Sequence, residues 1–223
     1  MIKLKDILFE SIPPNLLIPR RLDGRVEKYI QATIQKYIKD GSKGDLDLSG
    51  LNLIKLPSNL KSIKVGGDFY CNNNKLTSLE GAPTSVGGNF DCSINKLTSL
   101  EGAPTSVGGY FNCSINKLTS LEGAPTSVGG YFNCSYNKNK LTSLDNAPTS
   151  VGGGFYCNNN KLTSLDNAPT SVGGGFYCHN NKLNSLQGVP KSVSGNFNCG
   201  GNTKKFTKDE VRAVCDVMGS IYI

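Results

Sequence analysis

A 17-residue segment recurs six times along the chain, almost letter for letter. It first runs from Leu76 to Cys92 and returns at Leu97, Leu118, Leu141, Leu162 and Leu183. The period is 21 residues, with one two-residue insertion around 139–140. A fixed period in the twenties is typical of a solenoid, because one such unit cannot bury its own apolar face and must share a core with its neighbours. The repeat therefore predicts an elongated, mainly β solenoid, an architecture suited to binding more than to catalysis.

The pattern divides the chain of 223 residues into four parts. These are an N-terminal peptide and tether (1–20), a capping helix (21–45), the solenoid (46–202) and a C-terminal cap (203–223). Helical periodicity over Asp23–Lys39 predicts a helix that covers the open end of the first coil, and its display to a partner is the alternative. A capping box at Thr207-Lys208-Asp209-Glu210 predicts a second helix over Thr207–Met218.

Within one coil, Phe90 and Cys92 are two residues apart and therefore share one face of a strand, with Val86 on the same parity. Asn95 then turns the chain, and its side chain can bond the turning backbone and the neighbouring coils. The equivalent asparagines are expected to stack as a ladder; they are Asn74, Asn95, Asn116, Asn137, Asn160, Asn181 and Asn202.

The series Phe-x-Cys-x-x-Asn-x-Leu-x-x-Leu over 46–202 resembles the leucine-rich repeat. It is similar to the short repeats of bacterial effector proteins, and closer still to repeat proteins of large tailed phages, in which Gly-Gly-x-Phe-x-Cys-x-x-Asn units recur. The resemblance implies one parallel sheet, an extended, polyproline-like return side through Glu80–Ser85, and protein binding. No ligase domain follows the repeats, so it implies no ligase activity.

The cysteines are predicted to be free thiols packed as small hydrophobes. One falls in each coil, at Cys71, Cys92, Cys113, Cys134, Cys157, Cys178 and Cys199, and Cys215 lies beyond. Equivalent positions in stacked coils lie about 4.8 Å apart with parallel side chains, whereas a disulfide needs converging Cβ atoms about 3.8 Å apart. A straight column also cannot make a tetrahedral zinc site. We expect no metal and no cofactor, and reduced thiols favour the cytoplasm.

The residues that flank Phe and Cys are expected to point outward on a concave sheet. The candidate binding residues there are Asp68, Tyr70, Asp91, Tyr110, Tyr131, Tyr156, Tyr177 and His179. Tyrosines among small polar residues have the composition of a binding surface. The alternative is that aromatic residues simply favour strands.

Charge is spread unevenly along the chain. The net charge is +7, of which +5 lies in residues 1–67, so the solenoid is nearly neutral and nucleic-acid binding is not favoured. Lysines follow each asparagine turn, at Lys75, Lys96, Lys117, Lys140, Lys161 and Lys182, and an acidic column opposes them. We interpret both as solvated rims, and an anion-binding lysine row is the alternative.

Residues 1–10 resemble the capsid-targeting peptide of internal head proteins in T-even-type phages. Leu8-Phe9-Glu10 matches its ending, and the resemblance implies cleavage between Glu10 and Ser11, packaging in the virion and delivery into the host cell. A plain N-terminal helix is the alternative. No apolar run is long enough for a membrane span.

The sequence thus favours a non-catalytic protein-binding module, monomeric and cytoplasmic, that acts on a host factor. His179 is the only histidine, and the Gly-Gly pairs do not open helices as phosphate-binding loops do, so an enzyme is not expected. One rival hypothesis is a structural or packaged virion component, and another is binding to a glycan or other repetitive surface.

Overall fold

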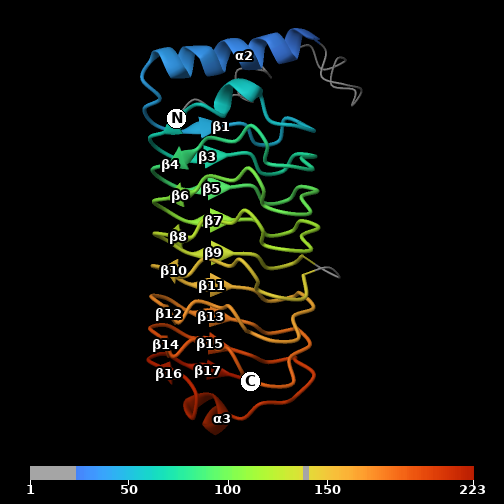
Figure 1. The fold of residues 1–223 in the computed structure, drawn as a ribbon, viewed down its shortest axis with the longest axis vertical. Coiled ribbons are helices and arrows are strands. Elements are labelled where there is room, and N and C mark those ends of the chain that lie inside the picture. Colours follow the sequence, from blue (N-terminus) through green and yellow to red (C-terminus); the bar gives the residue numbers. More distant parts are fainter. Residues whose placement is uncertain (1–23, 138–140) are drawn as a thin grey trace.

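The computed structural model describes residues 24–137 and 141–223, which form a parallel β-solenoid of about eight turns (Figure 1). Each turn contributes one two-residue strand to each of two parallel sheets. The chain therefore stacks along one long axis, and every coil contacts only the coils before and after it. Stability in such an architecture comes from the contacts between neighbouring coils.

The first sheet, here the Phe sheet, has nine strands in the order β1-β3-β5-β7-β9-β11-β13-β15-β17. Its strands are β1 (Leu46–Asp47), β3 (Phe69–Tyr70), β5 (Phe90–Asp91), β7 (Phe111–Asn112), β9 (Phe132–Asn133), β11 (Phe155–Tyr156), β13 (Phe176–Tyr177), β15 (Phe197–Asn198) and β17 (Ile221–Tyr222). Each Phe pairs with the Phe of the next coil, as Phe90 does with Phe111. The strands therefore pair in the register of the sequence repeat, with equivalent residues of successive coils side by side.

A second sheet, here the Val sheet, lies on the side that the sequence predicted as merely extended. Its eight strands are β2 (Lys64–Val65), β4 (Ser85–Val86), β6 (Ser106–Val107), β8 (Ser127–Val128), β10 (Ser150–Val151), β12 (Ser171–Val172), β14 (Ser192–Val193) and β16 (Asp216–Val217). Val86 thus belongs to a strand of its own, and its placement on the strand of Phe90 was wrong. The valine is buried and pairs with Val107 of the next coil.

The Gly-Gly pair forms the corner between the two strands of one coil. Gly87 and Gly88 lie between β4 and β5, and both continue the ladder through N–H donation to the carbonyl groups of Val65 and Gly67, at 2.8 and 2.9 Å. A Cβ atom on Gly108, the next coil's equivalent of Gly87, would collide with the carbonyl oxygen of Gly87. In the regular coils the stacked corners approach too closely for a side chain, which explains the glycine pair, although the last two corners hold Ser194 and Met218 at the first of the two positions.

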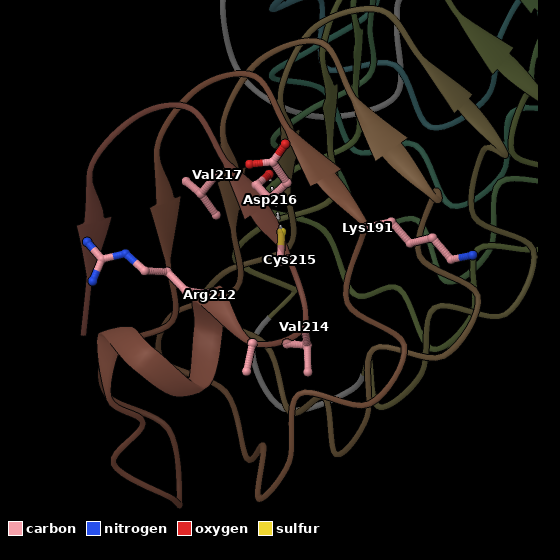
Figure 2. Close-up of a pocket in the computed structure, with 7 residues that line it drawn as sticks. Lys191, Arg212, Val214, Cys215, Asp216 and Val217 are labelled. Atoms are coloured by element: carbon pink, nitrogen blue, oxygen red, sulfur yellow. Dashed lines mark hydrogen bonds between the residues drawn. The ribbon is translucent and has the colours of Figure 1, made fainter.

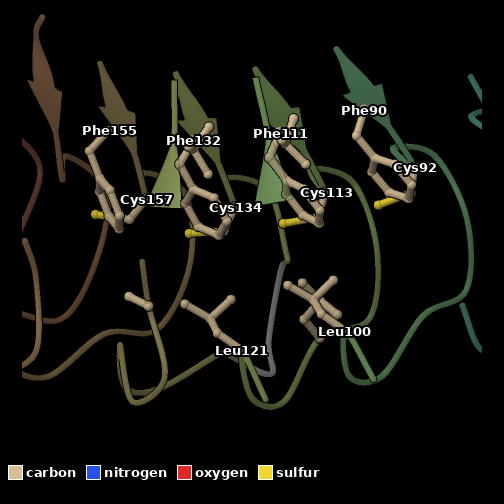
Figure 3. Packing of buried hydrophobic residues seen from close by; sticks show 14 of the residues in the cluster. Phe90, Cys92, Leu100, Phe111, Cys113, Leu121, Phe132, Cys134, Phe155 and Cys157 are labelled. Atoms are coloured by element: carbon tan, nitrogen blue, oxygen red, sulfur yellow. The ribbon is translucent and has the colours of Figure 1, made fainter. Parts of the chain in front are cut away.

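The core is a continuous column of stacked phenylalanines with a parallel column of cysteines (Figure 3). Neighbouring rings from Phe69 to Phe197 have centroids 5.0 to 5.6 Å apart. All eight cysteines are buried free thiols, and burial raises their pKa values, to about 12 for Cys134. Leucines such as Leu100 and Leu121 close the core from the other side (Figure 3).

The asparagine ladder predicted from the sequence is present. In one coil, the Asn116 carbonyl oxygen accepts from Leu97 N–H at 3.0 Å, and its amide donates to Cys92 O and Cys113 O, both at 3.1 Å. One buried side chain thus satisfies backbone groups of its own coil and of the preceding one. Such buried groups must find partners, so the asparagine fixes both the turn and the stacking.

The N-terminal end of the solenoid is covered by a helix. Helix α2 (Gly24–Lys39) lies across this end, buries Ile30 and Ile34, and packs against the short 3-10 helix η2 (Ser58–Leu60) (Figure 1). Asp23, the first residue of the predicted helix, lies outside the described residues.

The C-terminal helix is shorter than predicted. Helix α3 (Lys208–Arg212) has the expected capping box between Thr207 and Glu210, but it does not continue to Met218. Val217 instead pairs with Val193, and Ile221 pairs with Phe197. The repeat register resumes after the helix, so the chain completes one more coil.

Candidate binding surface

The outer face of the Phe sheet holds all eight candidate binding residues that the structure describes. Three columns face outward: the residue before each Phe, the residue after it, and the residue after each Cys. Asp68, Tyr110 and Tyr131 stand in the first column, Tyr70, Asp91, Tyr156 and Tyr177 in the second, and His179 in the third. All eight are half-buried, since neighbouring coils cover their flanks.

The five tyrosines form one stripe that crosses β3 to β13. The rings of Tyr110 and Tyr131 stack with centroids 4.5 Å apart and planes 6° apart, and those of Tyr156 and Tyr177 stack at 4.8 Å and 4°. Tyr131 meets Tyr156 edge to face at 5.7 Å. The hydroxyl of Tyr70 donates a hydrogen bond to Asp68 Oδ2 at 2.6 Å. The stripe is therefore ordered before any partner binds.

The stripe stays continuous although the tyrosines change columns along it. Tyr110 and Tyr131 precede Phe, whereas in the next two coils Gly precedes Phe and Tyr156 and Tyr177 follow it. A Cβ atom on Gly175 would lie 2.5 Å from Cε2 of Tyr177, and one on Gly154 would lie 3.0 Å from Cε2 of Tyr156. The glycine therefore leaves the space into which the ring folds.

The Asp and Asn side chains of this face accept hydrogen bonds from the backbone. In the first column, Asp68 Oδ1 accepts from Asn89 N–H at 2.7 Å, and Asn89 Oδ1 accepts from Tyr110 N–H at 2.9 Å. In the second column, Asp91 Oδ1 accepts from Ser93 N–H at 2.9 Å. Tyrosine has no carboxylate or amide to make these bonds, so its presence is not explained by the repeat's own needs.

Burial and hydrogen bonds shift the pKa values of Tyr70, Tyr131 and Asp68 on this face. Burial raises the pKa of Tyr70 to about 12, together with its hydrogen bond to Asp68, and burial raises the pKa of Tyr131 to about 12 as well. Burial also acts to raise the pKa of Asp68. Hydrogen bonds from the Asn89 backbone, Tyr70 and the Asn89 amide outweigh it, so the pKa of Asp68 is lowered. The phenols are hydrogen-bond donors across the physiological pH range.

His179 ends the stripe. Its ring lies edge to face with Tyr177, with centroids 6.4 Å apart, and its Nδ1 atom is buried and has no hydrogen-bond partner among the described residues. Burial lowers the pKa of His179, so the imidazole is neutral at pH 7. The imidazole thus adds one ring to the row of aromatic side chains.

In residues 24–137 and 141–223, no three His, Cys, Asp or Glu side chains form a group that could hold a metal ion. An open hollow of about 490 Å³ lies beside α3 and β16. Its Lys191 and Arg212 side chains point away from each other (Figure 2), and burial raises the pKa of Cys215 to about 11. Without a thiolate or converging charges, the hollow offers no evident chemistry. The described helices include none long and apolar enough to cross a bilayer.

Sequence reasoning missed a row of exposed apolar residues at the rim of the Phe sheet. Ile94, Ile115 and Tyr136 precede the ladder asparagines and are 45%, 50% and 43% exposed. Their φ angles are 54°, 55° and 58°, in the left-handed region. The signal was present in the sequence, because the same position holds Asn or Gly in other coils, the residues that tolerate positive φ.

Comparison with known proteins supports the fold alone. No protein-family model and no curated protein matches the sequence. Among solved structures, one described as the "Structure of Shigella effector LRR domain" is similar, with a TM-score of 0.62 and 19% sequence identity, over 96% of this chain and 94% of that chain. The chain therefore has a parallel β-solenoid fold of the leucine-rich-repeat type, as the sequence predicted.

Proposed function

We propose that this chain is a non-catalytic protein-binding module that holds its partner on the outer face of the Phe sheet. The observation that carries the proposal is the tyrosine stripe. Five tyrosines replace the Asp or Asn residues that bond the backbone in other coils, and they form an ordered row of phenol hydroxyls and ring edges. Rigid aromatic side chains with polar neighbours are typical of protein-binding surfaces.

The geometry of the stripe favours a protein over a glycan. Carbohydrate recognition by aromatic residues uses open ring faces, whereas the stacked pairs Tyr110–Tyr131 and Tyr156–Tyr177 turn their faces toward each other. Ring edges and hydroxyl groups remain for the partner, and these suit the mixed polar and apolar surface of a protein. The similar effector domain from Shigella supports a protein-interaction role for the fold.

The test replaces the stripe by residues that the fold already accepts. In one variant Tyr110, Tyr131, Tyr156 and Tyr177 become Asn, the residue at the same columns in other coils (Asn89, Asn112, Asn133 and Asn198). Immobilised wild type and variant are used to capture proteins from a lysate of the natural host, with quantitative mass spectrometry. We expect a captured protein to be lost from the variant by more than about tenfold, at unchanged thermal stability. Equal capture by both would contradict the proposal and favour the rival role as a rigid virion component.

The proposal further places the module in the host-cell cytoplasm as a phage-encoded protein acting on a host factor. Its support is the resemblance of the repeat to those of tailed-phage proteins and the neutral, buried thiols. Packaging in the virion rests on residues 1–10, and the cleavage site at Glu10–Ser11 lies outside the described residues. Mass spectrometry of the protein from purified particles tests it: a mature chain that begins at Ser11 supports packaging, and an intact Met1 contradicts it.

A further inference from the structure

One backbone position in each coil has a left-handed conformation at the rim of the Phe sheet, directly before the ladder asparagine. Along the described coils, this position holds Gly50, Asn73, Ile94, Ile115, Tyr136, Asn159, Asn180 and Gly201, with φ between 54° and 68°, and in the first coil Leu51 stands in place of the ladder asparagine. Asn and Gly adopt this conformation readily, whereas a β-branched residue does so only under strain. Three consecutive coils therefore carry residues that the local backbone disfavours.

The surrounding structure holds these residues in the strained conformation. Ile94 N–H donates to Ser114 O, and Ile115 N–H donates to Ser135 O, both at 3.1 Å. The next residue in each coil is a ladder asparagine with buried hydrogen bonds. Strain that a fold tolerates at consecutive positions is a pointer to function, because nothing in the repeat requires it.

These three residues form a contiguous apolar row, here the rim ridge (Ile94, Ile115 and Tyr136). Their side chains are about half exposed, so the row exposes apolar surface that the fold could avoid by using Asn. The rim ridge lies in the coils of Phe90, Phe111 and Phe132, and two of these coils also carry Tyr110 and Tyr131. It therefore lies in the same coils as the centre of the proposed binding surface.

We propose that the rim ridge docks an amphipathic helix of the partner protein, with the helix lying along the solenoid axis and carboxylate side chains flanking its apolar stripe. This inference rests on the proposed function and adds the chemistry of the partner. Equivalent residues of adjacent coils are about 4.8 Å apart. The apolar side chains of a helix at i, i+3 or i+4, and i+7 advance by about 5 Å, whereas those on one side of a strand advance by about 6.8 Å. The ridge therefore matches a helix better than an extended peptide.

The positive charge beside the rim ridge determines which charged residues the docked helix carries. Two residues after each ridge position stands a lysine, Lys96 after Ile94 and Lys117 after Ile115, and both are exposed. Lys75 continues the row in the preceding coil. A row of ammonium groups parallel to an apolar ridge complements a helix with Glu or Asp beside its apolar stripe.

Two synthetic peptides test the inference. Both are about 18 residues long, so that they can form helix, and carry the same Leu stripe at i, i+3, i+7; one has Glu beside the stripe and the other has Lys. Binding of each labelled peptide to the full-length protein is followed by fluorescence anisotropy at two salt concentrations. We expect the Glu peptide to bind at least about tenfold more tightly, and more weakly at high salt. Equal binding of both peptides, or none of the Glu peptide, would overturn the inference.

Variants locate the bound peptide. Ile94→Asn with Ile115→Asn removes the ridge while restoring the residue found in other coils, so the protein should become more stable and yet bind the Glu peptide at least about fivefold more weakly. Asn180→Ile is the matched control, because it adds the same strain and the same apolar side chain away from the ridge. It should lower stability and leave peptide binding unchanged. A ridge variant that binds as well as wild type would contradict the inference.

The two proposals fail in different ways. If the four Tyr→Asn substitutions leave peptide binding and partner capture intact while the ridge variant loses both, the tyrosine surface is wrong and the ridge stands. If the tyrosine variant loses its partner and the ridge variant keeps it, the protein-binding function stands and the helix-docking inference is wrong.

Discussion

Two columns of left-handed residues run the length of the solenoid, and they differ in what they accept. The return-side turn holds only Gly or Asn in the described coils, at Gly81, Gly102, Gly123, Asn146, Asn167 and Gly188. The rim column holds Asn or Gly in most coils but Ile94, Ile115 and Tyr136 in three consecutive ones. The first column follows the stereochemical rule for positive φ, and the second breaks it at the centre of the molecule.

The difference separates what the fold requires from what it permits. A Cβ atom on Gly123 would lie 2.5 Å from the carbonyl carbon of Leu100, so side chains there oppose the stacking of coils as well as the backbone conformation. The rim side chains point to solvent, so only the positive φ of the backbone disfavours Ile or Tyr at these positions. Residues that depart from the repeat at a permissive, exposed position are therefore the best indication of function in a repeat protein.

The largest expected effect comes from breaking the return-side column. Gly123→Ile combines positive φ with a collision against Leu100, and we expect it to lower the free energy of unfolding by about 4 kcal/mol. Urea denaturation followed by circular dichroism measures it. Asn146→Gly is the control and should change stability by less than about 1 kcal/mol, since the same column takes Gly elsewhere. A tolerated Gly123→Ile would mean that the two columns do not differ.

Substitutions of two neighbouring residues in one turn, Asn116 and Ile115, should change the stability of the protein in opposite directions. Asn116→Ala leaves Leu97 N–H without its partner and removes the hydrogen bond to Cys113 O and one of the two to Cys92 O, so it should cost about 3 kcal/mol in the same denaturation assay. Thr98→Ala, at an exposed position, should cost less than about 0.5 kcal/mol. If the two losses were equal, the ladder would not be a main source of inter-coil stability.

Substitution of Ile115, the residue before Asn116, should raise the free energy of unfolding instead of lowering it. Ile115→Asn relieves the strain at φ 55° and should raise the free energy of unfolding by about 1 kcal/mol. Asn is the residue at the same position in three other described coils, so no new contact is needed. Loss of stability in this variant would show that the rim isoleucines serve the fold, and the comparison of the two columns would lose its meaning.

The smallest effect concerns His179. Its folded-state pKa is lowered by burial, so the unfolded chain binds a proton at a higher pH than the folded one does. Protonation therefore favours unfolding, and stability should fall as pH drops below about 6.5. His179→Asn places the residue of the Asn158 position in the same column and should remove this part of the pH dependence. Melting curves at pH 5 and pH 7.5 for both proteins measure the difference, and identical pH profiles would contradict the assignment.

Much of the fold could be predicted from the repeat. Phe90, Cys92 and Asn95 at fixed spacing were sufficient for an inward-facing Phe and Cys pair and a stacked asparagine, because a solenoid places equivalent residues in register. Val86 was misplaced because parity alone cannot show where a strand ends. The break at Gly87-Gly88 depends on the approach of the preceding coil's backbone, which no single repeat reveals.

The candidate surface was predicted in part. The outward columns with Tyr110, Tyr131, Tyr156 and Tyr177 follow from alternation along the strand. That two columns merge into one stripe was not predictable, since the ring of Tyr177 reaches over Gly175 only when both residues are placed in three dimensions. The rim ridge was missed for a similar reason, because exposure and φ are properties of the folded coil.

The sequence by itself determined the solenoid, the length of its coil, and the residues that turn inward, because a unit of 21 residues can bury its apolar side chains only by stacking on copies of itself. Only the tertiary structure decided that the chain has two sheets, that the tyrosines form one ordered row, and that Ile94 and Ile115 are strained and exposed. Those features depend on contacts between successive coils, and a linear pattern does not contain the distances that set them.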